Sequence, residues 1–459
     1  MKSLITIFFL FPFQIILAQN PANSLNPVID SEKVVSWIKE NAYTLKSVEP
    51  GSGFEDLLSF EQILKNVTIV GLGEATHGTK EFIQMKHKMI EFLVMEMGFT
   101  VIATEFDFIG ANNINDYILY GKGDAYSALG SQGLAVWDTE EIIDLIEWLK
   151  NYNQSVPEEM RVKLRGFDFR ENYPGNNFTL IKNYLRKVDP SVAIQEDSLI
   201  SLVKLADSGK LKGVNVDSCK NEFLKLLANF SINSGIYIQN SSLKEYKTIL
   251  ERIKIIAENL TFNSLTNNDQ RALYNEKERL RDFYMASNFM GFVQDEPPDT
   301  KFIIWAHNMH IAKTDPTEND NIRMFGNYLK EAYGDKYYAF GFSFDKGSFQ
   351  SWGWTDKMES LGMMEFTVKD YHPRTLDWYL SKTGLNPFII NFRTNQIPKF
   401  MDDFLNTRLL TRRVGGSVVK SHVEMMNGPI VLKKAYDAII FINNTTSATP
   451  IVSQKTLIK

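Results

Sequence analysis

Cysteine is nearly absent from this chain, and Cys219 is the single example among 459 residues. One cysteine cannot form a disulfide within the chain, so the fold must be held by its apolar core and its hydrogen bonds. Cys219 lies in the polar segment VDSCKNEF, with no histidine near it in the sequence. A thiolate nucleophile needs a neighbouring base or cation, so the sequence argues against cysteine catalysis.

Two common signatures of hydrolytic enzymes are also absent. The sequence contains no G-x-S-x-G segment, which presents a nucleophilic serine, and no H-E-x-x-H segment, which binds catalytic zinc on a helix. Hydrolysis by this chain would therefore need water activated by a histidine, or by a metal gathered from scattered histidines and carboxylates.

The chain also lacks an excess of positive charge, because its formal net charge is −5. Without residues 1–18, which contain one basic and no acidic residue, 49 basic residues face 55 acidic ones and the formal charge is −6. Nucleic acid is therefore not an expected partner. The sequence contains no signal for an oligomeric state.

A long apolar run occurs at the start of the chain. Lys2 precedes it, residues 4–17 are almost all apolar, and the small residue Ala18 closes it, which is typical of a secretory signal peptide covering residues 1–18. The run is too short and one-sided for a comfortable membrane span. We therefore expect an exported protein, periplasmic or secreted, with no stable membrane insertion after signal cleavage. An uncleaved N-terminal anchor is the alternative.

The remaining chain, residues 19–459, is expected to form an α/β domain with a large core, since 44% of all residues are hydrophobic. A strand at residues 67–71, a helix from Thr79 to Gly98 and a strand at residues 100–104 make a βαβ unit, which implies a parallel sheet. Further strands are predicted at residues 161–166, 301–306, 337–343, 388–391 and 438–442. This pattern predicts a three-layer α/β/α fold with a mainly parallel central sheet.

Residues 177–294 interrupt this pattern with long amphipathic stretches and almost no strand signal. We interpret them as a helical insertion or subdomain. Whether these helices act as a lid over the sheet is left open by the sequence.

Titratable side chains follow four of the predicted strands. The first strand is followed by Glu74 and His77, the second by Glu105 and Asp107, the third by Asp168 and Arg170, and the fourth by His307, Asn308 and His310. A single such residue is most often a loop or capping group. Four strand ends of a parallel sheet, however, open into one crevice, and a convergence of acids and bases there is the geometry that acid–base catalysis needs.

Lys86 interrupts the apolar stripe that Phe82, Met89 and Leu93 form on the first helix. A buried ammonium group requires carboxylate partners, and Glu74 or Glu105 at the adjacent strand ends could provide them. The alternative is a lysine whose stem lies along the edge of the stripe while its charge reaches solvent.

Several segments resemble blocks of the erythromycin esterase family. The segment GLGEATHGTKEF contains the family's Gly-Glu-x-x-His-Gly pattern, and WAHNMHIA contains its Trp-Ala-His-Asn-x-His pattern. Further segments resemble other family blocks in the same order, namely ATEF, LRGFDF, RDFYMASN and MFGNYLKEAYGDKYYAFGFSFDKGSF. The resemblance extends from residue 60 to the C-terminus.

The resemblance implies hydrolysis, without metal or cofactor, of the lactone in fourteen-membered macrolide antibiotics such as erythromycin, and hence macrolide resistance. In this scheme His77 removes a proton from water and Glu74 orients His77 or the water. The resemblance implies that Glu105 holds a cation or a substrate hydroxyl. Stabilisation of the oxyanion falls to cationic or donor groups, for which the candidates are Lys86, Arg281, His307 and His310. The family often has arginine in place of Lys86, so the role of Lys86 is open.

Two other functions remain open on the sequence. One is hydrolysis of a different ester or lactone, because a fold and a motif do not name a substrate. The other is an exported haem- or metal-binding protein in which His307 and His310 act as ligands. The three histidines outside the family blocks, His87, His372 and His422, are expected to be surface or packing residues.

Overall fold

The computed structural model describes residues 30–170, 175–192, 214–314, 322–369 and 373–451. The predicted signal peptide, residues 1–18, lies outside these ranges, as does His372. Among the described helices, none has both the length and the apolar character needed to cross a membrane.

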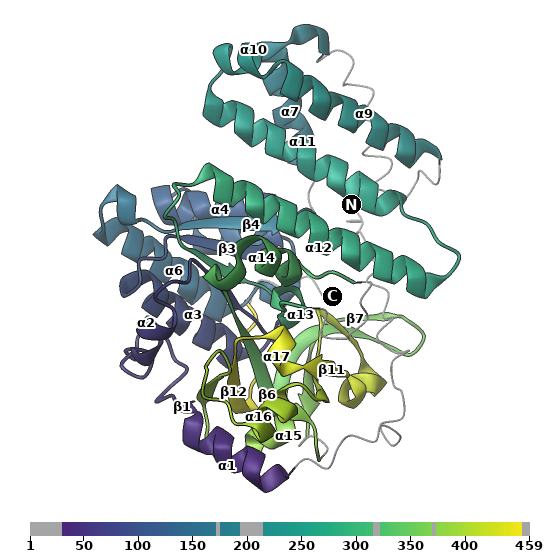
Figure 1. The fold of residues 1–459 in the computed structure, drawn as a ribbon. Coiled ribbons are helices and arrows are strands. Elements are labelled where there is room, and N and C mark those ends of the chain that lie inside the picture. The colour runs from purple at the N-terminus through teal and green to yellow at the C-terminus, as the bar shows by residue number, and fades with distance from the viewer. Residues whose placement is uncertain (1–29, 171–174, 193–213, 315–321, 370–372, 452–459) are drawn as a thin grey trace.

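A large, mainly parallel sheet forms the centre of the protein (Figure 1). Its parallel part has the spatial order β12 (Ala438–Thr445), β6 (Tyr337–Trp354), β2 (Ile69–Leu72), β5 (Phe302–Trp305), β3 (Val101–Asp107) and β4 (Lys163–Asp168). Beyond β12, the sheet continues with the antiparallel strands β8 (Phe388–Asn391) and β1 (Tyr43–Thr44). Every residue of β2, β3 and β5 is buried, as expected for parallel strands covered on both faces.

Helices cover both faces of this sheet. Successive strand residues point to opposite faces, so Tyr338 and Phe340 of β6 join one apolar core while Tyr337 and Ala339 join the other. The first core contains residues of α3 (Lys80–Met95), α4 (Phe108–Tyr120) and α6 (Glu140–Ser155), and the second contains residues of α1 (Ser31–Asn41), α12 (Gln270–Asp295) and α14 (Phe325–Tyr333). The predicted three-layer α/β/α fold is therefore confirmed.

The C-terminal part of β6 forms a smaller layer that the sequence did not predict. This strand continues past its predicted end at Ser343 and pairs with β7 (Ser360–Val368) and β10 (Ser417–Val419). A separate two-stranded ribbon is formed by β9 (Arg408–Arg412) and β11 (Asn427–Val431). The remaining short helices are α2 (Ser59–Ile63), α5 (Ala125–Gly130), α13 (Asn308–Ile311), α15 (Leu376–Ser381), α16 (Lys399–Leu405) and α17 (Leu432–Ala435).

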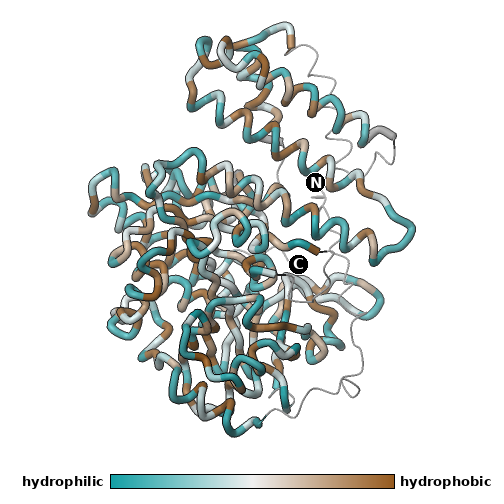
Figure 2. Tube along the Cα trace, viewed as in Figure 1, coloured by the Kyte–Doolittle hydropathy of each residue, from teal (hydrophilic) through white to brown (hydrophobic). Residues whose placement is uncertain are grey.

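The described residues between β4 and β5, in the region interpreted from the sequence as an insertion, form α7 (Gly175–Val188), α9 (Val214–Ile232), α10 (Ser234–Gln239), α11 (Leu243–Ser264) and α12. The first four pack around an apolar core of their own, which includes Phe223, Phe230 and the buried Cys219. Figure 2 shows polar and apolar residues alternating along these helices, as expected for helices that bury one side.

The long helix α12 connects the insertion to the sheet, and in Figure 1 it lies between the upper helices and the strands. Met285, Ala286 and Phe289 of α12 belong to one of the two cores that flank the sheet. On the insertion side, Asn288 of α12 donates a 3.0 Å hydrogen bond to Glu258 of α11. Because α12 packs on the sheet, it can present side chains to the ends of the strands.

Candidate active site

The loop after β2 carries Glu74 and His77 and is packed closely against neighbouring backbone. A Cβ atom at Gly78 would lie 2.3 Å from the carbonyl oxygen of Gln350, so only glycine fits there. The Gly78 carbonyl in turn accepts hydrogen bonds from the backbone of Gln350 at 2.9 Å and of Ala448 at 3.0 Å. These contacts fix the loop at the carboxyl end of the sheet.

Lys86, Glu74 and His77 form a linear chain of charge-assisted hydrogen bonds. The Nζ of Lys86 donates to Oε2 of Glu74 at 2.5 Å, and Nδ1 of His77 lies 2.5 Å from Oε1 of the same carboxylate. Lys86 and Glu74 are completely buried, and His77 is 8% exposed. Lys86 therefore does not reach solvent, and its carboxylate partner is the first of the two that the sequence suggested.

The ammonium group of Lys86 is enclosed in an apolar environment. Its Nζ lies 4.3 Å from the centre of the Trp305 ring, a distance suited to a cation–π contact. Burial lowers the pKa of Lys86 to about 8, although the charges of Glu74 and Glu105 act in the opposite direction. The charge of Lys86 thus depends on the carboxylate that it holds.

Arg281 of α12 is the centre of a second buried network. Its Nη2 donates to Oε1 of Glu105 at 2.7 Å and to Oδ2 of Asp168 at 2.8 Å. Its Nη1 lies 2.9 Å from Nε2 of His310, whose Nδ1 lies 2.8 Å from Oδ1 of Asp282. Burial favours the neutral form of Glu105. The positive charges of His310 and Arg281 outweigh this effect and hold the pKa of Glu105 well below its ordinary value.

The protonation of His310 is set by the groups on its two ring nitrogens. Burial opposes a positive charge, yet Asp282 and Glu105 raise the pKa of His310 to about 10. The 2.9 Å approach of Arg281 to Nε2 fits a neutral ring, whereas a charged ring would donate toward Glu105 at 3.4 Å. We assign the charged form, because two carboxylates face the ring against one guanidinium. Asp282 keeps Nδ1 protonated in either form.

His307 joins the two networks. Its backbone N–H donates to Oε2 of Glu105 at 2.9 Å, and its ring centre lies 5.1 Å from that of His77. Burial and the neighbouring His77 lower the pKa of His307 well below the ordinary value, so the ring is neutral. Its Nδ1 accepts from Met309 at 3.3 Å, and its Nε2–H therefore donates to the carbonyl of Val414 at 3.2 Å.

The structure thus brings all seven site residues predicted from the sequence into one connected cluster. They are Glu74, His77, Lys86, Glu105, Arg281, His307 and His310. The other strand-end residues have local roles, because Asn308 bonds both backbone groups of Phe342 and Arg170 pairs with Asp168. No group of three His, Cys, Asp or Glu side chains suited to a metal ion occurs among the described residues.

Two residues near His77 were not found by inspecting the strand ends. Trp137 contacts the His77 ring at 5.1 Å between ring centres, and Val414 donates its backbone N–H to the carbonyl of Ala75 at 2.9 Å. Both lie in loops without periodic sequence patterns. Together with Gly416, where a Cβ would lie 3.7 Å from the His77 ring, they cover the cluster.

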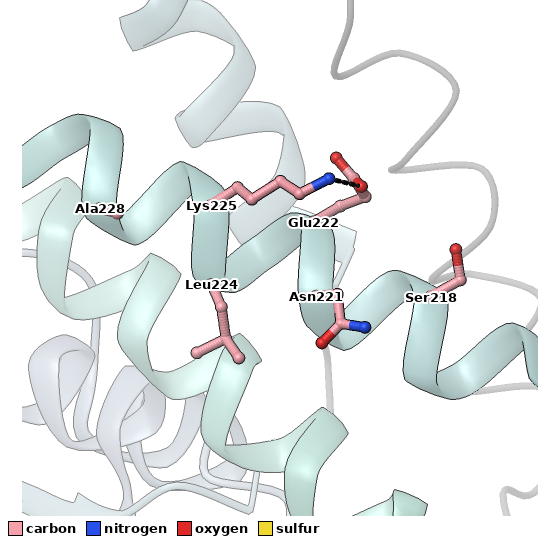
Figure 3. A pocket seen from close by; sticks show the side chains of 6 residues that line it. All are labelled: Ser218, Asn221, Glu222, Leu224, Lys225 and Ala228. Atoms are coloured by element: carbon pink, nitrogen blue, oxygen red, sulfur yellow. Dashed lines mark hydrogen bonds and ion pairs between the residues drawn. The ribbon is translucent and has the colours of Figure 1, made fainter.

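Two other histidines and a hollow on α9 lie outside this cluster. His87 is buried against Trp148 and is a packing residue. His422 is partly exposed near Asp356 and lies at the surface. A hollow on α9 (Figure 3) is lined by Ser218, Asn221, Glu222, Leu224, Lys225 and Ala228. It contains an ion pair between Lys225 and Glu222 but no imidazole, and it belongs to the helical insertion rather than to the strand ends.

A three-layer α/β/α fold with acids and bases gathered at the carboxyl ends of its parallel strands is typical of an enzyme that uses acid–base catalysis. More specifically, the chain belongs to the erythromycin esterase family, whose model matches residues 94–445. The matched region contains Glu105, Arg281, His307 and His310. Glu74, His77 and Lys86 precede it.

Two curated relatives agree with this assignment. The chain is 24% identical over 387 residues to an erythromycin esterase type II from Escherichia coli. This alignment covers 81% of this chain and 91% of the relative. It is also 24% identical over 323 residues to the putative hydrolase YbfO from Bacillus subtilis, covering 66% of this chain and 70% of the relative.

Solved structures show the same fold. A Bacillus cereus protein that is 24% identical superimposes with a TM-score of 0.78, covering 92% of this chain and 99% of that one. A mutant of the erythromycin esterase EreC in its open conformation is 18% identical and gives a TM-score of 0.67, covering 88% of this chain and 98% of that one. At these identities the likeness extends to the fold.

Proposed function

We propose that this protein hydrolyses the lactone ester of macrolide antibiotics by a direct attack of water, with His77 as the general base. The observation that carries the proposal is the buried chain from Lys86 through Glu74 to His77. It supplies an oriented imidazole, and among the described residues no serine or cysteine side chain is hydrogen-bonded to it. Family membership supports the ester as the bond that is cleaved.

Glu74 determines which nitrogen of His77 can act as the base. A carboxylate at 2.5 Å from Nδ1 keeps the proton on that nitrogen, so Nε2 has the free lone pair. The carboxylate also stabilises the imidazolium that forms when Nε2 takes a proton from water. Lys86 fixes the other oxygen of Glu74 and thereby its orientation.

The oxyanion formed by the attack needs a hydrogen-bond donor. The hydrogen bonds of Lys86 and Arg281 commit these cations to buried carboxylates, whereas Nε2–H of His307 is bound to a neutral carbonyl at 3.2 Å. Exchanging the Val414 carbonyl for a charged oxyanion strengthens that hydrogen bond. His307 is therefore our choice for the oxyanion donor, with Arg281 and His310 as its electrostatic support.

Because His77 is only 8% exposed, substrate access requires the residues that cover it to move apart. The carbonyl of Val414 would have to leave His307 in the same movement, which couples access to the release of the oxyanion donor. A different lactone as substrate remains the second candidate, and the similarity to a putative hydrolase favours it. As ligands for haem or a metal, His307 and His310 are less suitable, because their ring nitrogens already have protein partners.

The apolar residues 1–18 support export as part of this proposal. A periplasmic or secreted esterase would open macrolides before they reach the ribosome-containing compartment, which would confer resistance. Mass spectrometry of the mature N-terminus and macrolide susceptibility of a deletion strain test these two points.

The activity is tested with purified protein, erythromycin and other macrolides of different ring size. We expect each accepted macrolide to gain the mass of one water molecule, with no change when the His77→Asn variant replaces the wild-type protein. Hydrolysis of simple lactones without hydrolysis of any macrolide would reject the substrate class. Absence of hydrolysis of every ester in the panel would reject the function.

The pKa of Lys86 predicts a loss of activity in alkaline solution. Above about pH 8 the ammonium group loses its proton, and Glu74 then loses the cation that orients it. In a Lys86→Arg variant the guanidinium stays charged at all accessible pH values. We therefore expect kcat/KM of the wild-type protein to fall above pH 8, and the same fall to shift to higher pH in Lys86→Arg.

Profiles of kcat/KM between pH 6 and pH 10 make this comparison, with thermal unfolding as the check that each variant is folded. A Lys86→Met variant serves as the control, because it lacks the charge at every pH and should be weakly active throughout. An unchanged alkaline limb in Lys86→Arg would show that another group titrates there.

A further inference from the structure

Trp137 is held beside the proposed base by an unusual local structure. It ends a single 3-10 turn, Ala135–Trp137, between α5 and α6, and is 2% exposed. Its ring meets that of His77 nearly at right angles, 80° between planes and 5.1 Å between centres, and on another side it packs on Phe106 at 5.0 Å. A large aromatic side chain thus forms one wall of the space around His77.

The indole N–H of Trp137 has no hydrogen-bond partner among the residues that the structure describes. A buried donor left unpaired is costly, and buried tryptophans usually find an acceptor for this group. Trp305 and Trp354 share the feature, but Trp305 lies behind Lys86 and Trp354 makes no ring contact with His77 in the described residues. Trp137 alone combines an unpaired donor with contact to the proposed base.

The segment of residues 446–451, which we term the strap, holds Trp137 and His77 in register. On the His77 side, the Thr446 carbonyl accepts from Lys80 at 3.0 Å, and Ala448 donates to Gly78 at 3.0 Å. On the Trp137 side, Ile451 donates to the Asp138 carbonyl at 3.2 Å. Trp137 therefore has a fixed position relative to the catalytic loop, although it comes from a different part of the chain.

We propose that Trp137 is a substrate-binding residue, whose indole N–H donates a hydrogen bond to an ester or hydroxyl oxygen of the bound lactone next to the scissile bond. This inference rests on the proposed function, because it assigns the donor to the substrate of that same site. The ring also limits the orientations that His77 can adopt. No acceptor in the part of the chain that the structure describes competes for the N–H, so the donor is available as soon as the substrate enters.

Binding and hydrolysis are measured separately to test the inference. In a His77→Asn background, in which turnover is expected to be too slow to consume the ligand during a titration, calorimetry gives the Kd of erythromycin and of a simple macrocyclic lactone with and without Trp137→Phe. Phenylalanine keeps most of the ring and removes the donor. Loss of one neutral hydrogen bond predicts a Kd about 3- to 10-fold higher. With His77 present, we expect KM to rise by a similar factor while the pH profile of kcat keeps its shape.

Trp354→Phe is the matched control, since it also removes a buried unpaired indole N–H, and its Kd and KM should equal those of the parent. Unchanged ligand affinity in Trp137→Phe, or no binding of either lactone to the parent, would overturn the inference. So would a lower thermal stability with unchanged Kd, which would assign Trp137 a packing role. If the wild-type protein binds lactones but hydrolyses none, the proposed function fails, and the Kd comparison still decides the role of Trp137.

Discussion

Replacing His77 with asparagine is expected to lower kcat of ester hydrolysis by about a thousandfold, within the range of 10²–10⁴ typical of general bases. Asparagine can still bond to Glu74, but it has no nitrogen that accepts a proton from water. Because asparagine is polar and can keep the hydrogen bond to Glu74, the variant should unfold at nearly the same temperature. Steady-state kinetics and thermal unfolding measure the two effects.

Glu74→Gln provides the matched test of the carboxylate. The amide has nearly the same shape, but it no longer fixes the proton on Nδ1 of His77, and a comparable loss of kcat is expected. If the two residues act as one unit, the double variant should be hardly slower than either single variant. Turnover of His77→Asn within tenfold of the wild-type value would show that another group is the base.

Much of this site could be predicted because parallel strands end at the same edge of a sheet. Strand β8 has the predicted bounds, residues 388–391, and buried runs such as that of β5 carry a strong strand signal. The polar residues that follow β2 and β5, and those in the last three residues of β3, which runs past its predicted end at residue 104 to Asp107, then had to converge. Lys86 could be recognised because a charged residue interrupts an otherwise apolar stripe. Such a lysine either pairs with a buried carboxylate or extends its charge to solvent, and the structure shows the first arrangement.

Other parts could not be predicted, for identifiable physical reasons. Beyond Ser343, β6 continues through the charged and glycine-containing residues 345–347, and its pairing with β7 and β10 compensates for the weak strand propensity. Trp137 contacts His77, and Val414 contacts His307. Both contacts come from connecting segments, in which the sequence has no periodic pattern that would indicate which residues are neighbours in space. Their places follow from tertiary contacts, including those of the strap, that a single sequence does not encode as a pattern.

The position of Arg281 links the helical insertion to the chemistry. This residue lies on α12, which continues from α11 of the insertion, and its guanidinium holds carboxylates from the ends of two strands, Glu105 and Asp168. Movement of α12 would therefore carry a positive charge away from the site.

Replacing Arg281 with methionine is expected to destabilise the protein by roughly 3–5 kcal/mol at neutral pH, the usual cost of leaving a buried charge without its partner. Methionine fills much of the same volume, so the loss reflects charge rather than packing. Glu105 and Asp168 are 2% and 1% exposed, so solvent cannot replace the guanidinium. Activity should fall as well, because His310 and Glu105 lose a shared partner. Denaturant unfolding and steady-state kinetics provide the two measurements.

The pH dependence of this loss distinguishes charge from packing. In the wild-type protein, burial disfavours ionised Glu105 and Asp168, but neighbouring cations lower both pKa values, so these acids stabilise the fold above their ordinary pKa and lose that contribution as pH falls. Without Arg281, the pKa of both acids rises from its wild-type position, because only His310 at Glu105 and Arg170 at Asp168 then oppose the effect of burial. The variant therefore takes up protons at a higher pH than the wild-type protein, and the stability deficit of Arg281→Met should be largest near pH 7.5 and shrink as the pH falls through the pKa values of the two acids in the variant.

Arg170→Met is the control, because Arg170 also pairs with Asp168 but its side chain is 18% exposed and Arg281 remains in place. Its deficit should be clearly smaller at every pH. Adding Asp168→Asn to Arg281→Met should recover part of the lost stability, since it removes one of the two buried negative charges that Arg281 held. A deficit that grows toward pH 5, or one that Asp168→Asn deepens, would show that Arg281 stabilises the fold through packing and that the two carboxylates do not need its charge.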